Sequence, residues 1–441
     1  MISIAEAQQL VGTVASPPLA VHRPLAEVLG LVLAEDVRSD LDMPPHDKAL
    51  VDGFAVRSAD LVQGQVELEV VGKIIAGQPP WECTAALASG QAVQIMTGAA
   101  IPPGADAVVM VERTETRRLN SGQSYIATVN DIGFRSGQNI MRRGMEMTRG
   151  QIVLASGTKL RPQEVGVLAA IGQHQVPVWP RPHVAVISTG NELVEADQLP
   201  GPGQIRNSNG PTLAALVARA GGVPLYRGIA RDTTDDLRSL VEEGLEADVL
   251  LLSGGVSAGD FDLVPHILHQ LAVREVFHKV DLKPGKPVWF GVRDRKPTAG
   301  VRDLPRNVAS GNLRPDSKAS TLVFGLPGNP VSVIVCFELF VRPALRRILG
   351  LSDPGPKTVW AALAGDWTTR SDRPTYHPAQ LVRTGEKWQV RPVRWKGSGD
   401  LRSMVEANAF AIIPPGEHRF RSGDPIQVLC MESHEPSCCS G

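Results

Sequence analysis

A regular alternation of apolar runs and amphipathic segments between about residues 180 and 350 constrains the fold of this chain most strongly. The apolar run at 183–188 has the length of a buried strand, and 211–220 repeats its apolar residues at helical spacing. The alternation continues with strands ending near Ala230 and Ser253 and lying near Val288 and Val323, and with helices at 235–245, 261–271 and from Val331 onward. This pattern predicts a parallel sheet that helices cover on both faces.

The flanking parts of the chain follow other patterns. Ser3 and Glu6 form a capping box that opens a helix, and 162–171 is helical again. Between them, runs such as 66–75 and 105–112 are broken by Gly and Pro at turn-like spacing, which predicts a small β domain. We expect this domain to be inserted between two helical stretches that pack together. Further short β runs toward the C-terminus predict a compact barrel or sandwich.

The fold class is therefore α/β plus β in a multidomain chain. The changes of pattern place a discontinuous N-terminal or linker domain at 1–44 and 138–175, a β-rich inserted domain at 45–137, the α/β domain at 176–350, a C-terminal β domain at 351–432 and a tail at 433–441. Residues 293–320 interrupt the α/β domain with seven Lys or Arg, three Asp and almost no large apolar residues. This composition predicts a mobile surface insertion. The favoured interpretation is a solvated loop, and the alternative is a basic segment that attracts an acidic partner.

Charge and cysteine usage narrow the class of protein. The 441 residues contain 45 Lys and Arg against 46 Asp and Glu, without the basic excess of a nucleic-acid binder. Five Cys without a CxxC pair are too sparse for a disulfide framework or a cysteine zinc site, which favours the cytoplasm. The N-terminus lacks a basic segment before an apolar one, and the apolar segment 331–349 is interrupted by charges. We therefore expect neither nucleic acid nor a membrane as a partner.

Polar, glycine-rich segments follow the predicted strands, at the sheet edge where ligands bind in open α/β folds. Ser188–Glu192 offers hydroxyls and backbone N–H groups either for a phosphate at the start of a helix or for an ordinary helix cap. Ser253–Asp262 is more specific, because its three glycines allow an anion-binding nest and Asp260 and Asp262 can supply oxygen ligands to Mg²⁺. Asp232 adds a third carboxylate at the same edge, unless it is only a helix N-terminal Asp.

Other loops carry weaker signals. Lys283–Pro287 places two ammonium groups in a stiff turn, although surface lysines are usually just solvated. Gly325–Pro330 leads into the last helix with Ser332 in its first turn, either as an oxyanion site or as a rigid loop. The segments 44–56 and 96–106 are polar turns of the inserted β domain, and loops of this kind are enriched in function.

Familiar catalytic signatures are absent from the sequence. Pro287 stands where a P-loop has Ser or Thr, and Arg206 stands where a dinucleotide fingerprint has its third glycine. HExxH and GxSxG motifs are missing as well, so hydrolytic zinc or serine chemistry has no support. What remains is the handling of anions by amides, lysines and carboxylates, as in a metal-assisted phosphoryl or nucleotidyl step.

Six segments in this order resemble the molybdopterin molybdenumtransferase family, which includes bacterial MoeA and the E domain of gephyrin. They are DKALVDGFAV at 47–56, MTGAAIPPGADAVV at 96–109, STGNEL at 188–193, SGGVSAGDFD at 253–262, KPGKP at 283–287 and GLPGNPVS at 325–332. The resemblance implies an elongated homodimer of four-domain chains with a molybdopterin-binding α/β domain and a C-terminal β-barrel. It also implies that molybdate is inserted into adenylated molybdopterin while Mg²⁺-dependent cleavage releases AMP, with a molybdopterin adenylyltransferase and molybdenum enzymes or their chaperones as further partners.

The resemblance also implies roles for individual residues. Asp262 is the candidate for hydrolysis, with Asp260 and Asp232 placing metal or water, and Asp52 and Thr97 come from the β domain to complete a cleft of the dimer partner. The remaining substrate contacts that it implies are Ser188, Thr189, Glu192, Gly254, Gly255, Ser257, Lys279, Lys283, Lys286, Pro287, Pro327, Pro330, Ser332, Arg373 and Ser398.

The sequence departs from the family pattern at two motif positions. Met145 and Glu146 follow Gly144 where an acidic pair is usual, and Tyr376-His377-Pro378 stands where an aromatic-x-Arg is expected. The insertion at 293–320 lies close to the implied molybdate site, as a lid or as an inert loop. A scaffold protein and an adenylyltransferase are the alternative functions, but the intact lysines and carboxylates disfavour the first and the β domain and barrel disfavour the second.

Overall fold

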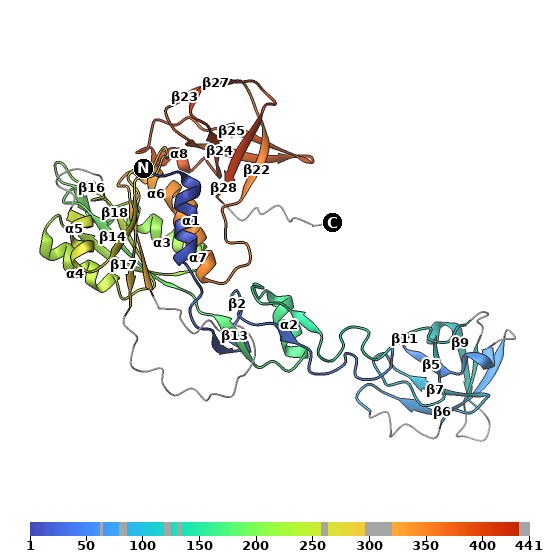
Figure 1. Cartoon of the computed structure of the whole chain (residues 1–441). Helices are drawn as coiled ribbons and strands as arrows, with labels where there is room; N and C mark the ends of the chain where they lie inside the picture. The colour runs from blue at the N-terminus through green and yellow to red at the C-terminus, as the bar shows by residue number, and fades with distance from the viewer. Residues whose placement is uncertain are drawn as a thin grey trace. The chain divides into compact units, whose positions relative to one another are not determined.

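The computed structural model describes residues 1–61, 65–78, 86–118, 125–129, 134–256, 263–295 and 320–431 (Figure 1). These residues form two compact units. Unit 1 comprises Met1–Ala34, Gly157–Leu160 and Val176–Gly441, and unit 2 comprises Glu35–Ser156 and Arg161–Gln175. No helix within the described ranges combines the length and the apolar character needed to cross a membrane.

A six-stranded sheet forms the centre of unit 1. Its strand order is β17 (Val223–Ala230), β14 (His183–Thr189), β18 (Val249–Ser253), β21 (Ser320–Leu326), β20 (Trp289–Asp294) and β19 (Arg274–His278). The first four strands are parallel, which confirms the predicted parallel sheet. The last two pair antiparallel at one edge, a detail that the βα alternation does not reveal. Apart from its ends in β20 and β21, the insertion expected at 293–320 falls on 296–319, outside the described residues.

The central strands are apolar on both faces because helices cover both. Val184 and Val186 of β14 belong to one buried cluster, whereas Ala185 and Ile187 belong to another, as the two-residue period of a strand requires. The first cluster includes residues of α1 (Ile4–Val14), α3 (Asn209–Arg219), α6 (Pro330–Cys336), the π-helical segment η5 (Phe337–Val341) and α7 (Arg342–Ile348). The second includes residues of α4 (Thr234–Gly244) and α5 (Leu263–Gln270).

The N-terminal helix shows how the sequence begins this packing. The Ser3 hydroxyl accepts a hydrogen bond of 3.1 Å from the Glu6 N–H, so the predicted cap is confirmed. Ala7 and Val11 are buried, and α1 packs against η5 and α7 (Figure 1). The other predicted helix, α2 (Pro162–Ala170), belongs to unit 2. The expected packing of the two helical stretches against each other stays a prediction.

The C-terminal part of unit 1 is a closed barrel, as the sequence and its family resemblance predict. Its strands are β22 (Thr358–Leu363), β25 (Lys387–Pro392), β24 (Thr375–Thr384), β26 (Ala409–Ile413) and β28 (Pro425–Cys430). Smaller elements complete the unit: β23 (Trp367–Ser371) paired with β27 (Gly416–Phe420), α8 (Leu401–Met404), β15 (Leu193–Val194) with β16 (Ile205–Arg206), η1 (Leu25–Glu27), and a three-stranded sheet of β1 (Val21–Pro24), β13 (Gln175–Trp179) and β2 (Val32–Leu33).

Unit 2 is mostly β structure, in agreement with the predicted β-rich insertion. Its main sheet has the order β8 (Ala107–Met110), β5 (Gly53–Val56), β7 (Gln91–Ile95), β6 (Val66–Ile74), β10 (Tyr125–Val129) and β9 (Thr114–Arg118). Two short pairs accompany it, β4 (Lys48–Ala49) with β11 (Ile140–Met141) and β3 (Val37–Arg38) with β12 (Ile152–Leu154), together with α2, η2 (Ser58–Leu61) and η4 (Val111–Arg113). The domain boundaries drawn from the sequence stay a prediction.

Candidate active site

A cavity of about 710 Å³ opens at the carboxyl ends of the parallel strands of unit 1. The loops that follow β14, β17, β18 and β21 line it, which is where open α/β sheets bind their ligands. Eight of the residues that we expected from the sequence lie in its wall: Thr189, Glu192, Asp232, Gly254, Gly255, Pro287, Pro327 and Pro330. The structure thus brings together motifs that are up to 140 residues apart in the chain.

The segment after β14 differs from both of its expected forms. Thr189 and Glu192 line the cavity, but the next helix, α3, begins only at Asn209, after β15 and β16. Ser188–Glu192 is therefore the end of β14 with the loop that follows it, and both expected forms were wrong in placing a helix start here. Ser188 itself is fully buried and donates a hydrogen bond of 3.0 Å to Asn207 Oδ1. Its hydroxyl therefore stabilises the position of Asn207 in the cavity wall.

The loop after β18 requires glycine for steric reasons. Gly254 has φ +98 and Gly255 has φ +64, a region of backbone conformation that side chains disfavour. A Cβ at Gly254 would also lie 2.7 Å from the Thr189 carbonyl oxygen, closer than atoms approach. The Gly254 N–H donates to the Leu326 carbonyl, which fixes this loop to the end of β21. The Gly254 N–H is thereby already bonded within the protein, and the rest of the predicted segment, 257–262, lies outside the described residues, so the anion-binding nest stays a prediction.

Asn209 is a wall residue that sequence reasoning missed. Its amide nitrogen donates to Ser253 Oγ over 2.9 Å and to the Gly328 carbonyl over 2.7 Å. One side chain at the start of α3 therefore joins the loops that follow β18 and β21. The available signal is a polar residue just before the helix predicted at 211–220, and an ordinary helix cap gives the same signal.

Asn207 is the second missed residue. Its buried side chain accepts hydrogen bonds from Ser188 and from the Gly210 N–H, and it donates to the Tyr226 hydroxyl over 2.8 Å. Tyr226 in turn donates to Glu195, and its burial raises the pKa of the phenol far above the ordinary range. This chain of hydrogen bonds, which ends on the Glu195 carboxylate, holds the first turn of α3 against β14.

Two carboxylates, Glu192 and Asp232, lie exposed in the cavity wall. Asp232 Oδ2 accepts the Asn191 N–H over 3.1 Å, and the Asn191 side chain accepts the Asp232 N–H, so the turn after β17 is locked to the loop after β14. Within the described ranges no three His, Cys, Asp or Glu side chains form a metal-binding group. The predicted metal residues Asp260 and Asp262, together with Ser257, lie outside the described residues.

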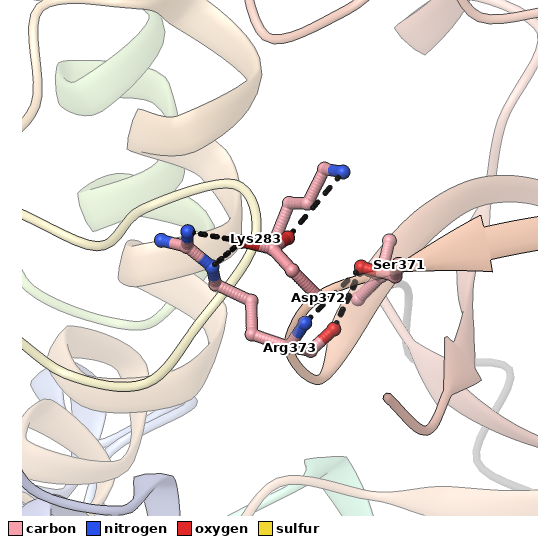
Figure 2. A network of polar contacts seen from close by, with 5 residues as sticks. Lys283, Ser371, Asp372 and Arg373 are labelled. Atoms are coloured by element: carbon pink, nitrogen blue, oxygen red, sulfur yellow. Dashed lines mark hydrogen bonds and ion pairs between the residues drawn. The ribbon is translucent and has the colours of Figure 1, made fainter. Parts of the chain in front are cut away.

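Lys283, Asp372 and Arg373 form a second polar group of unit 1, which we call the Lys283 cluster. Figure 2 shows the Asp372 carboxylate between the Lys283 ammonium and the Arg373 guanidinium. Lys283 Nζ lies 3.8 Å from Asp372 Oδ1, and both Nε and Nη2 of Arg373 bond to Asp372 Oδ2. The hydrogen bond from Arg373, with the charge of Lys283 as a smaller cause, lowers the pKa of the Asp372 carboxyl below its ordinary value.

Backbone contacts fix the Lys283 cluster between the α/β domain and the barrel. The Lys283 N–H donates to the Pro374 carbonyl over 2.9 Å, and the Tyr376 N–H donates to the Lys283 carbonyl over 2.8 Å. Ser371 Oγ donates to the Arg373 carbonyl over 2.8 Å (Figure 2). Two sequence-predicted residues from distant segments, Lys283 and Arg373, therefore come together on one carboxylate.

The remaining predicted residues of unit 1 stand outside the cavity wall. Ser332 is buried in α6, Lys286 is exposed, and Lys279 adopts φ +70 beside β19. Ser398 accepts the Asn329 side-chain amide through its Oγ and the Val331 N–H through its carbonyl, each over 3.0 Å. Ser398 thus ties the barrel to the first turn of α6.

In unit 2 the structure brings together the predicted pair of Asp52 and Thr97. Asp52 Oδ1 accepts the Thr97 N–H over 2.6 Å and the Thr97 hydroxyl over 2.7 Å. The backbone hydrogen bond, followed by the hydroxyl, lowers the pKa of the Asp52 carboxyl. Both residues are exposed, so the pair presents an ionised carboxylate on the surface of unit 2.

The structure describes both positions at which the sequence departs from the family pattern. Met145 is exposed, and Glu146 forms an ion pair of 3.4 Å with Lys48. His377 is half-buried against Trp367 and Trp395, and burial lowers the pKa of its imidazole. His377 is therefore a neutral packing residue of the barrel and does not replace an arginine as a cation.

Comparisons with known proteins agree with this architecture. Family models for the MoeA N-terminal region (domain I and II), a probable molybdopterin binding domain and the MoeA C-terminal region (domain IV) match residues 2–172, 185–347 and 361–431. The molybdopterin molybdenumtransferase of Bacillus subtilis (strain 168) is 35% identical over 418 residues, covering 94% of this chain and 90% of that protein. The protein of the same name from Staphylococcus aureus (strain MRSA252) is 33% identical over 440 residues, covering 98% and 96%.

A solved structure extends the match to three dimensions. The crystal structure of a molybdopterin biosynthesis MoeA protein from Pyrococcus horikosii superposes with a TM-score of 0.78 at 31% identity, covering 98% of this chain and 99% of that one. This likeness confirms the multidomain α/β plus β fold. Because sequence identity, family models and fold agree over nearly the whole length, the chain belongs to the MoeA family of molybdopterin molybdenumtransferases.

Proposed function

We propose that this protein inserts molybdate into adenylated molybdopterin and, with Mg²⁺, cleaves the pyrophosphate link to release AMP. This would be the last step of molybdenum cofactor synthesis. The observation that carries the proposal is the convergence of the glycine loop at Gly254 and Gly255 with the carboxylates Glu192 and Asp232 in one cavity of the molybdopterin-binding domain. A substrate with two linked phosphates needs amide donors and a divalent cation together.

The cavity would bind the phosphates chiefly through neutral groups. The backbone N–H groups that follow Gly254 would supply donors, with Thr189, whose hydroxyl lies 3.5 Å from the Ser253 carbonyl, beside them. Asn209 and Asn207 keep the surrounding loops in place. Fixed dipoles of this kind stabilise phosphate charge without having to reorganise.

Asp232 and Glu192 are the described residues with the oxygen ligands that Mg²⁺ prefers. Asp232 is held by Asn191 through one carboxylate oxygen, which leaves a preoriented acidic group facing the cavity. Mg²⁺ bound there would neutralise charge on the phosphate oxygens. Asp260 as a further ligand and Asp262 as the residue for hydrolysis, with Ser257 as a substrate contact, complete the proposal.

Molybdate is a dianion, and the Lys283 cluster supplies cations for it. Lys283 and Arg373 meet at this cluster, and Lys286, Pro287 and Lys279 belong to the same β19–β20 connection or border it. We assign these residues, together with Ser332 and Ser398, to the oxyanion and pterin side of the substrate. Charge-assisted hydrogen bonds to an oxyanion are among the strongest polar contacts in proteins.

We further propose a cytoplasmic homodimer in which Asp52 and Thr97 of unit 2 complete the site of the other subunit. A molybdopterin adenylyltransferase would supply the substrate, and molybdenum enzymes or their chaperones would receive the product. Two inactive variants, Asp52→Ala and Asp232→Ala, test the arrangement when they are mixed and allowed to exchange subunits. Shared sites would restore about a quarter of wild-type activity, because each mixed dimer keeps one intact site. Failure of the mixture to regain activity would show that each chain completes its own site.

The reaction is tested by AMP release from adenylated molybdopterin, with Mg²⁺ present and molybdate either present or omitted. The product is then used to reconstitute a molybdenum-dependent apo-enzyme. Molybdate-dependent AMP release with an active product supports the proposal. Tight substrate binding without AMP release contradicts it and points to a carrier or scaffold role instead.

A further inference from the structure

The Lys283 cluster contains an acidic residue at the position where the proposed function requires an anion to bind. Asp372 contacts both cations assigned to molybdate, Lys283 at 3.8 Å and the Arg373 guanidinium through two nitrogens (Figure 2). The carboxylate thus satisfies the same two positive charges that the oxyanion would use. An incoming dianion either displaces Asp372 or binds beside a negative charge.

The backbone at Lys283 is fixed, and the carboxylate is the most exposed of the three side chains. Lys283 and the segment after Asp372 are joined by two backbone hydrogen bonds, and Ser371 fixes the Arg373 carbonyl. The Arg373 side chain is 24% exposed, whereas the Asp372 side chain is 62% exposed. A solvated aspartate on a fixed backbone rotates away at small cost, because exposed ion pairs contribute little net free energy.

We propose that Asp372 is a built-in competitor for the oxyanion, which pairs with Lys283 and Arg373 until molybdate displaces it. The inference rests on the proposed function, because it takes these two cations as the oxyanion site. Asp372 then sets the affinity of the site for the oxyanion. It lowers the net positive charge around a dianion, and it keeps both cations extended toward one point. Removing its charge increases oxyanion affinity, whereas a residue that only positioned the cations would have the opposite effect.

The test measures binding of molybdate alone to the full-length protein by calorimetry, comparing wild type with Asp372→Asn and Asp372→Ala. Both variants are expected to bind molybdate about three- to tenfold more tightly at low salt, with the gain shrinking at high ionic strength. Asp353→Asn is the matched control, because Asp353 is an exposed carboxylate paired with Lys357 outside the cavity wall and the Lys283 cluster. Its molybdate affinity is expected to equal that of the wild type.

A kinetic measurement separates this inference from the proposed function. In the AMP-release assay, Asp372→Asn is expected to lower the KM for molybdate while leaving kcat within about twofold, as loss of a ground-state competitor requires. If wild type binds molybdate and turns over while the variant binds it equally or more weakly, the role of Asp372 is disproved and the proposed function stands. If neither protein binds molybdate and AMP release is insensitive to it, both proposals fail together.

Discussion

The cavity and the Lys283 cluster are two polar regions of unit 1 with opposite chemistry. Among the described residues of the cavity wall, Arg206 is the one cation, and the other polar groups are amides, hydroxyls and the carboxylates Glu192 and Asp232. The Lys283 cluster consists of charged side chains around Asp372. In our proposal, one region binds anions through fixed dipoles and the other through full charges.

This difference teaches what each region depends on. Backbone N–H groups bind an anion well only where the chain is held in one conformation. The cavity therefore depends on glycines that fit its tight loop and on asparagine side chains whose hydrogen bonds join its loops. Charges act over longer distances but are screened by salt, with a Debye length near 10 Å at 0.1 M. The two regions should therefore respond differently to substitution, salt and pH.

The largest effect is expected from a methyl group in the cavity loop. Gly254→Ala places a Cβ 2.7 Å from the Thr189 carbonyl at φ +98, so the loop must move and the proposed nest is lost. We expect AMP release to fall about 100-fold or more, the range seen when an oxyanion donor is removed. Molybdate binding in calorimetry should stay near the wild-type value. Gly385→Ala is the control, because Gly385 has φ +63 with open space around it. If that variant were equally inactive, the steric clash at Gly254 would not explain the loss of activity.

A smaller effect is expected when the cluster loses a charge. Lys283→Ala removes one of the two cations of the Lys283 cluster, so the KM for molybdate should rise about tenfold at low salt. The rise should shrink as NaCl is added, whereas the defect of Gly254→Ala should not. Lys357→Ala, which removes the partner of Asp353, is the control for loss of a surface lysine. A salt-independent rise would mean that Lys283 acts through its backbone contacts instead.

The sequence predicted the strand ends well because local pattern determines them. Apolar runs of five to seven residues followed by Gly, Ser or Asp placed Thr189, Gly254 and Pro327 at one sheet edge, and the structure confirms this through the cavity that they line. The parallel sheet follows from the same alternation. The antiparallel pair β19 and β20 did not, because their connection contains no helix and strand direction leaves no local signal.

Contacts between residues far apart in the sequence could not be predicted from the sequence. Asn209 bonds to a residue 119 positions away, and Lys283 meets Asp372 only because the barrel packs beside the β19–β20 connection. A side chain carries no local signal of a distant partner, so neither Asn209 nor Asp372 is predicted from the sequence. The family resemblance implies Arg373, but its contact with Asp372 is visible only in the structure.

The carboxylate of unit 2 gives a pH-dependent prediction. Thr97 lowers the pKa of Asp52, so the ionised form of Asp52 persists to lower pH than it otherwise would. Thr97→Val removes the hydroxyl but keeps the backbone N–H, and the pKa of Asp52 should rise part of the way back. The acidic limb of the pH–activity profile should then move to higher pH, with activity near neutral pH little changed. Thr114→Val, on β9 of the same unit, is the control, and an unmoved acidic limb would exclude ionised Asp52 from the reaction.

The smallest effect is expected from a substitution in unit 2 that changes neither the cavity nor the Lys283 cluster of unit 1. Glu164 begins α2 of unit 2, where it accepts the Arg161 N–H over 2.9 Å and pairs with the Arg161 guanidinium, which lowers the pKa of Glu164 to about 2. Glu164→Gln should therefore reduce the free energy of unfolding of unit 2 by about 1 kcal/mol at pH 7, as loss of a helix cap does. A lowered pKa stabilises the folded state fully above the ordinary value of 4.5 and progressively less below it, so the difference should disappear as the pH falls from 4.5 to about 2. Urea titrations at several pH values measure it, and kcat and the molybdate KM should match the wild type. A loss of activity without a loss of stability would mean that α2 contributes to the reaction, and that the contrast within unit 1 does not account for all of the site.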